Sequence, residues 1–286
     1  MPVTTPEPHA PLPDRGLYGP GSLTWRIMGE PVIWVAGFRA LYMQALHPRV
    51  MRGTWQNTSF ARPGEAWGRF VRTTEFVAVR TYGSLPEVER VGRRLRKIHA
   101  SLTGIDQDGT RFRLDEPELL LWVHCGEIGS YVDIARRCGM GLSAADLDAF
   151  VGEQRRSAAV VGLDPETVPG SVAALEAYYE RVRPGLYACA EAKQALRRSF
   201  NPDVPAQYLP LKLMVPPLNT LAFATLPRWA RRMYGLPGSP VTDLGATVAL
   251  RMAHQSVTRI PRQLIYLPAA RAAKRRERER ERRAAA

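Results

Sequence analysis

Several features that would identify common protein classes are scarce or missing from this chain. Only three cysteines occur in 286 residues, and none lies in a Cys-x-x-Cys pair, so the sequence predicts neither a disulfide framework nor a zinc knuckle. No apolar run approaches the roughly 18 residues of a membrane-spanning helix. The first residues are rich in proline and lack the apolar core of a secretory signal. We therefore expect a cytoplasmic protein.

The short motifs of several enzyme classes are absent as well. The chain contains no Gly-x-Gly-x-x-Gly after a strand, no P-loop, no Gly-x-Ser-x-Gly and no His-Glu-x-x-His. The usual dinucleotide, phosphate, hydrolase and zincin sites therefore lack their key residues. Cys-x-x-Cys-His is also missing, which excludes a haem attached covalently in the c-type manner.

Helical periodicity and clear helix ends dominate the chain from about Leu23 onward. Residues 84–87 and 115–118 read as capping boxes that begin helices to about Leu102 and Arg137, and Ser143 begins another. Residues 110–114 are expected as a short strand or extended chain. Further helices are predicted over 171–182, 185–199, 206–224 with a proline break, and 241–256. The expected fold class is all-α, a single multi-helix bundle domain with at most a short β-hairpin.

Charge and composition divide the chain into three parts. The net charge is +13, and eight basic against three acidic residues from Arg271 to Arg283 place +5 of it at the C-terminus. We expect a disordered N-terminal arm over 1–20, a helical domain over 21–268, and a basic charged tail over 269–286. The tail is interpreted as a solvated helix or disordered segment.

Three of the five histidines lie in helical contexts. His99 follows Leu95 by four residues and Val91 by eight, which places it on or beside a buried stripe. His124 has a similar apolar setting, and His47 precedes a proline, so we expect it to end a helix. For each of them, ordinary packing with a hydrogen bond to the backbone stays an open alternative to a ligand role.

The segment 67–73 places a cation near a hydroxyl. Arg69, Arg72 and Thr73 are three or four residues apart on one predicted helix, so they share a side of it. The apolar residues around them predict a helix largely surrounded by protein. A buried arginine needs an anion, which a haem propionate, a phosphate or a carboxylate of Glu75 or Glu118 would supply.

An ordered series of motifs resembles a known family. The series resembles the oxygenase family that includes the latex-clearing rubber oxygenases and the mycophenolate-pathway oxygenase MpaB, over about residues 23–240. The motifs are QALHPRV (44–50), GRFVRT (68–73), TYG (81–83), KIHA (97–100), LLLWVH (119–124) and LPRWARRMYGLP (226–237).

The resemblance implies a globin-like helical core that holds non-covalent haem b and acts with O2 on a small, apolar molecule. It implies that His99 is the proximal iron ligand, and that Arg69 and Thr73 belong to the family's Arg-x-x-x-Thr motif. We assign Arg69, Arg72 and Thr73 as candidate catalytic residues. His47 and His124 are further candidates for contact with the cofactor.

The chain departs from the family pattern at three places. Rubber oxygenases have a lysine where this chain has Arg72, and arginine does not ligate iron readily. They also have a glutamate upstream of the Arg-x-x-x-Thr motif, whereas residues 47–64 contain no acid. Many members have His-Ser where this chain has Asn57 and Thr58. Cleavage of polyisoprene is therefore poorly supported.

Two other interpretations stay open. The first is a non-enzymatic basic protein that contacts nucleic acid or an anionic membrane surface. No nucleic-acid recognition motif is found in the sequence. Any membrane contact is expected to be peripheral, through the basic surface. A non-haem metal oxygenase would use His47, His99 and His124, but lacks the carboxylate of a facial triad. The substrate and the oligomeric state are not determined by these patterns.

Overall fold

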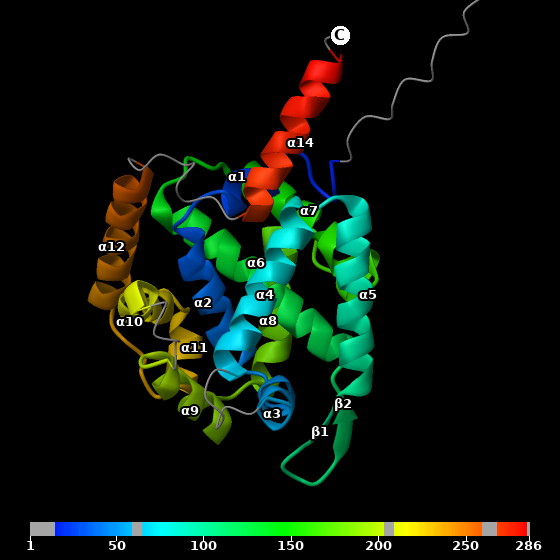
Figure 1. Ribbon diagram of the computed structural model, residues 1–286. Helices are drawn as coiled ribbons and strands as arrows, with labels where there is room; N and C mark the ends of the chain where they lie inside the picture. The colour runs from blue at the N-terminus through cyan, green and yellow to red at the C-terminus, as the bar shows by residue number, and fades with distance from the viewer. Residues whose placement is uncertain (1–14, 59–64, 203–208, 259–267, 285–286) are drawn as a thin grey trace, which may run out of the picture.

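The computed structural model describes residues 15–58, 65–202, 209–258 and 268–284, which are almost entirely helical (Figure 1). The expected all-α bundle with a short β-hairpin is confirmed. The helices are α1 (Leu23–Met28), α2 (Ile33–Gln44), α3 (Pro48–Gln56), α4 (Glu65–Tyr82), α5 (Leu85–Ser101), α6 (Pro117–Cys138), α7 (Ala144–Val161), α8 (Val172–Val182), α9 (Ala190–Ser199), α10 (Leu209–Ala224), α11 (Arg228–Met233), α12 (Pro240–Thr258) and α14 (Pro268–Ala284). The other elements are the 3-10 turns η1 (Pro165–Thr167) and η2 (Arg183–Gly185) and the antiparallel strands β1 (Thr103–Ile105) and β2 (Arg111–Arg113).

Helix α6 runs through the centre of the bundle because apolar or small residues lie on almost all of its sides. Trp122, Ile128 and Ile134 are fully or almost fully buried, and α2 packs along much of the helix. Gly126 permits this close approach, since a Cβ there would lie 3.2 Å from Cγ of Gln44. The helix ends as expected at Gly139, whose φ of +82° is the left-handed conformation that favours glycine.

Local signals predicted most helix starts correctly. At α5 the Ser84 hydroxyl and backbone NH both bond to the Glu87 carboxylate, each at 2.8 Å, and Ser143 begins α7 in a similar box. The box expected at 115–118 is wrong. Helix α6 has Glu116 as its N-cap without a side-chain bond, because that carboxylate accepts from the backbone NH of Arg113 instead.

Two expected helices differ in their extent. Helix α9 begins at Ala190 rather than 185, because residues 183–185 form the separate turn η2. The predicted proline break in 206–224 does not occur, since α10 continues through Pro216 and Pro217. The first residues of that predicted helix, 206–208, lie outside the described part of the chain.

Both ends of the described chain pack on the bundle. Residues 1–14 of the expected arm lie outside the described residues, but Tyr18 is buried and its hydroxyl donates to Oε1 of Gln154 at 3.3 Å. Helix α14 buries Ala270 and Ala273 against Tyr82 and packs along α4. The basic tail is thus a helix with one packed side. In the described part of the chain, no helix is long and apolar enough to cross a membrane.

Candidate functional site

Helices α4 and α5 form a hairpin that brings Arg69 and His99 to the same end of the bundle. The chain reverses at Gly83 and Ser84, so α4 and α5 run antiparallel, and the start of α4 and the end of α5 point to the same end of the bundle (Figure 1). Burial lowers the pKa of His99, and the positive charge of Arg69 lowers it further. The structure therefore places these two predicted site residues within electrostatic reach of each other.

Arg69 reaches from α4 to the C-terminal end of α3, where a hydroxyl of the helix and one just beyond it hold its guanidinium. Its Nη1 donates to Oγ1 of Thr58 at 2.7 Å, and its Nη2 donates to Oγ1 of Thr54 at 3.2 Å. Burial, with a contribution from Arg72, lowers the pKa of the Arg69 guanidinium. Arginine nevertheless stays charged in proteins, so a partly enclosed cation is held here by neutral groups.

The carboxylate partner considered for Arg69 is not found around it. Neither Glu75 nor Glu118 forms an ion pair with Arg69 among the described residues; Glu118 lies 3.9 Å from Arg49 instead, and Glu75 is exposed. The alternative of a pair between Arg69 and Glu75 or Glu118 is therefore not borne out in the described structure. Because a desolvated cation without a counter-ion is costly, this position is suited to receive an anion.

His99 is half-buried on α5. Its Nδ1 is inaccessible to solvent and has no hydrogen-bond partner among the described residues. Burial and the Arg69 charge outweigh the opposing charge of Asp115, so the pKa of His99 lies below its ordinary value. The imidazole is neutral near pH 7, so one of its two ring nitrogens carries a lone pair.

Arg72 and Thr73 lie on α4 close to Arg69, but both are exposed. The Thr73 hydroxyl donates to the backbone carbonyl of Arg69 at 3.0 Å. Arg80, two turns farther along the same side of α4, is buried against α6. One side of α4 therefore passes from buried at its C-terminal end to accessible beside Thr73.

A cluster of aromatic side chains that the sequence analysis missed joins α2 to α4. The rings of Phe38 and Phe70 stack with centroids 5.5 Å apart, and Trp67 lies 5.6 Å from Phe70. Trp34 completes the cluster at 6.4 Å from Phe70. All four rings are only partly buried. The expectation that this half of α4 is largely surrounded by protein is therefore wrong. Their spacing shows that each pair shares a helix side, but only the tertiary structure shows that the two sides meet.

His47 lies elsewhere and begins a helix rather than ending one. It is the N-cap of α3, because Pro48 occupies the first helical position, where its missing NH costs nothing. Its ring centroid lies 6.4 Å from that of Trp122. Burial and the charge of Arg49 lower its pKa, and its Nδ1 is buried without a partner in the described structure.

The three histidines do not form a common metal centre. In the ranges that the structure describes, no three His, Cys, Asp or Glu side chains are grouped closely enough to hold a metal ion. A non-haem centre built from His47, His99 and His124 is therefore not supported. A haem, by contrast, requires only one protein ligand, so the absence of a three-residue cluster does not bear on a haem site.

His124 lies close to a buried polar network between α4 and α6. It is 4% exposed, and burial lowers its pKa to about 4 despite the nearby Glu127 carboxylate. Glu127 accepts two hydrogen bonds from Arg80, at 2.6 and 3.1 Å, and a third from Tyr131 at 3.1 Å. The imidazole is thus neutral and enclosed, as expected for a packed core histidine.

The buried His124 makes the stability of the fold depend on pH. Its pKa falls from 6.5 to about 4 on folding, so between these pH values the unfolded chain binds the proton and the folded chain does not. The free energy of unfolding is expected to fall by about 3 kcal/mol from this group as pH drops through that window. Urea denaturation of wild type and His124→Gln at several pH values measures it. The variant should show a shallower decrease, and parallel curves would contradict the assignment.

A surface cavity of about 640 Å³ lies at the opposite end of α4. Tyr82, His254 and residues of α14 line it, and neither Arg69 nor His99 does. Thirteen residues of helix separate Arg69 from Tyr82, a distance of about 20 Å along the axis. The cavity is therefore not part of the site on the α4–α5 hairpin.

Comparison with known proteins supplies the family. No curated protein and no solved structure matches the chain significantly. The family model described as ER-bound oxygenase mpaB/B'/Rubber oxygenase, catalytic domain, matches residues 25–259, which include both helices of the hairpin and nearly all of the bundle. The resemblance expected from the motif series is thereby confirmed, and the chain belongs to the mpaB and rubber oxygenase catalytic-domain family.

Proposed function

We propose that this chain is a haem b-dependent oxygenase that acts with O2 on a small, apolar molecule. The observation that carries the proposal is that His99 and Arg69 lie within electrostatic reach of each other. His99 is a neutral imidazole whose Nδ1 is inaccessible and has no partner among the described residues. Arg69 is a cation bound by hydroxyls and by no carboxylate among those residues. Family membership supports oxygenase chemistry, and no observation favours the alternative of a non-enzymatic basic protein.

The residues present fit a haem. A neutral imidazole would hold the haem iron, and the lowered pKa of His99 favours that state. The propionates need cations, and Arg69 is a cation with no competing carboxylate among the described residues. The donor set thus contains one group for the metal and one for the acidic edge of the ring.

Haem b with a single protein ligand supplies O2 binding and activation. In this arrangement His99 would hold the iron, and Arg69 would fix the orientation of the group through a propionate. Thr54 and Thr58 keep the guanidinium in place through the bonds they accept. Because these hydroxyls already restrict the long Arg69 side chain, it loses less conformational entropy when it binds a propionate.

Arg72 and Thr73 serve as polar groups on the accessible side of α4. Arg72 stays protonated, so it donates hydrogen bonds or pairs with an anion and does not take the place of a ligating lysine. Thr73 has a hydroxyl that donates to a backbone carbonyl and can accept a further bond. The half-exposed cluster around Phe70 offers an apolar surface nearby on the same helix, which favours an apolar substrate.

Reconstitution of the full chain with haemin tests the proposal. We expect a Soret band, one haem per chain, and O2 consumption that depends on a reductant or an oxidisable substrate. Analysis for iron and zinc in the purified protein separates haem from a free metal ion. A protein that leaves the absorption spectrum of free haemin unchanged, or that carries a stoichiometric non-haem metal, would refute it.

Replacing Arg69 with methionine should affect the apo-protein and the haem complex in opposite directions. Removal of a desolvated, unpaired cation raises the free energy of unfolding of the apo-protein by about 1–3 kcal/mol. Loss of the propionate partner weakens haem binding by about tenfold or more. Denaturation of the apo-protein and the rate of haem transfer to apomyoglobin measure the two effects.

Arg72→Met is the matched control, because Arg72 is an exposed arginine one turn away on the same helix. It should leave the stability of the apo-protein within about 0.5 kcal/mol of wild type. If Arg69→Met destabilises the apo-protein and leaves haem retention unchanged, the side chain has a structural role and does not bind the propionate.

A further inference from the structure

Helix α12 presents an apolar side to solvent. Val241 is 78% exposed, Leu244 66% and Met252 62%, and such large values are unusual for a continuous set of apolar side chains. We call this side the α12 face. It consists of Val241, Leu244, Gly245, Val248, Ala249 and Met252, all of them exposed.

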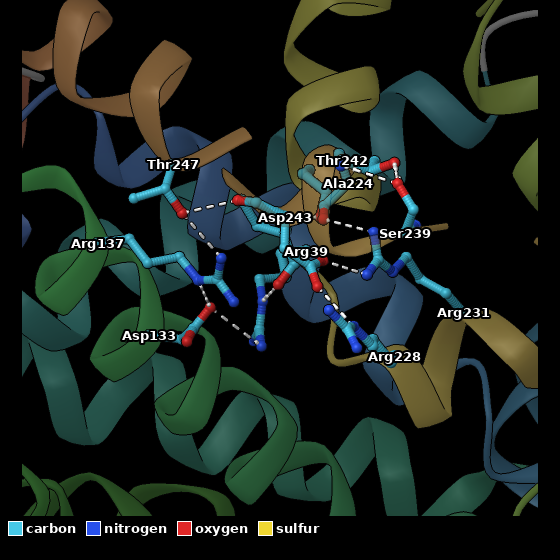
Figure 2. Close-up of polar contacts among 12 residues, drawn as sticks. Arg39, Asp133, Arg137, Ala224, Arg228, Arg231, Ser239, Thr242, Asp243 and Thr247 are labelled. Carbon is cyan, nitrogen blue, oxygen red and sulfur yellow. Dashed lines mark hydrogen bonds and ion pairs between the residues drawn. The ribbon is translucent and has the colours of Figure 1, made fainter. Parts of the chain in front are cut away.

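Contacts on the opposite side fix this orientation. Ala246 and Leu250 are buried in the bundle. Asp243 forms ion pairs with Arg228 and Arg231 of α11, and the Thr247 hydroxyl accepts from Arg137 of α6 at 3.1 Å (Figure 2). Because both polar and apolar contacts hold the inner side, α12 cannot hide its outer face by turning about its axis.

The exposed area is large enough to matter. The α12 face amounts to roughly 500 Å², within the range of the largest apolar patches on monomeric proteins, which are often functional. The neighbouring helix α10 packs against α12 and exposes 71% of Leu213 and 54% of Met214. A standard protein interface takes roughly 800 Å² from each partner, so the α12 face alone would supply more than half of that area.

The absence of charge on the α12 face makes it the part of the surface where a second copy of this chain meets least repulsion. The protein carries a net +13, so two copies repel each other over most of their surfaces. The α12 face has no charged side chain, and Arg251 at its border donates to the backbone carbonyl of Arg137. Helices that lie on anionic lipid instead carry several lysines or arginines on the polar side, and α12 has only Arg251.

The middle of the face is suited to close helix packing. Gly245 has no atom within 4 Å of a built Cβ, and Ala249 lies one turn farther along. These two small residues stand symmetrically about position 247, so an antiparallel pair of α12 helices would oppose Gly245 with Ala249 of the second copy. A two-fold interface requires a surface that complements itself in this way.

We propose that the α12 face forms a two-fold interface with the same face of a second copy, with the two α12 helices antiparallel. The mass of the full-length protein in solution, measured by light scattering across a range of concentrations, tests this. Wild type should have twice the mass of one chain. Leu244→Glu should raise the dimer dissociation constant by about 100-fold or more, because it places a charge in the centre of the interface.

Two further variants separate the possible occupants. Gly245→Leu should weaken the dimer by blocking close packing, whereas a face that binds lipid would gain affinity for vesicles of phosphatidylserine and phosphatidylcholine from the added apolar side chain. Ile105→Glu, an exposed apolar residue on β1, is the control and should leave the dimer intact. A wild-type monomer at all concentrations, or a dimer that survives Leu244→Glu, overturns the proposal.

Discussion

Replacing His99 with alanine is expected to abolish stoichiometric haem binding. His99 is the half-buried, neutral imidazole beside Arg69, and within the described structure its Nδ1 has no other partner. Loss of an iron ligand should weaken haem binding by more than the 10–100-fold typical of residues that only support a ligand. Haemin titration followed at the Soret band measures the affinity.

His47→Ala is the matched control for this experiment. His47 is also half-buried, also has a lowered pKa, and also has an Nδ1 without a partner in the described ranges. It lies on α3 beside Trp122 rather than on the hairpin, so its variant should keep the Soret band. In the His99→Gly variant, added imidazole should take the place of the missing ring and restore the spectrum of five- or six-coordinate haem iron. An unchanged spectrum in His99→Ala, or loss of the band only in His47→Ala, would transfer the ligand role to another histidine.

Replacing Arg80 with methionine is expected to lower the free energy of unfolding by about 3–5 kcal/mol. The change leaves the Glu127 carboxylate buried without the two hydrogen bonds that Arg80 donates. Burial would raise the pKa of Glu127, but Arg80 more than compensates and holds it below its ordinary value. Thermal unfolding should begin roughly 10 °C lower for the variant.

Arg93→Met provides the comparison for a surface pair. Arg93 binds Glu89 one turn away at 2.5 Å, but both side chains are more than half exposed, so the change should cost less than about 1 kcal/mol. The double variant Arg80→Met, Glu127→Leu should recover much of the lost stability, because it removes the orphaned charge along with its partner. Equal effects of Arg80→Met and Arg93→Met would show that burial does not strengthen the inner pair.

The pH dependence of Arg80→Met distinguishes charge from packing. In wild type, the lowered pKa of Glu127 contributes stability that is present above pH 4.5 and is lost as pH falls through the folded-state pKa. In the variant the unpaired carboxylate gains a proton more easily, so the difference between the two proteins should shrink in acid. A constant difference would indicate that the methionine acts through packing alone.

The sequence by itself determined the local architecture and the family. Helix ends follow from nearby residues, such as the Ser84 and Glu87 box and the left-handed Gly139, because these groups satisfy backbone donors and carbonyls within one turn. The position of His99 on its helix follows from the same periodicity. The order of the motifs indicated the oxygenase family that the family model then matched.

Only the tertiary structure decided which side chains meet. The sequence could not exclude Glu75 or Glu118 as the partner of Arg69, since pairing depends on the distance between helices rather than on spacing along one of them. It also gave no sign that Arg80 is paired with Glu127, or that the outer side of α12 has no covering element among the described residues. Such contacts arise from the packing of whole helices, which is set by the summed burial of many residues far apart in the chain.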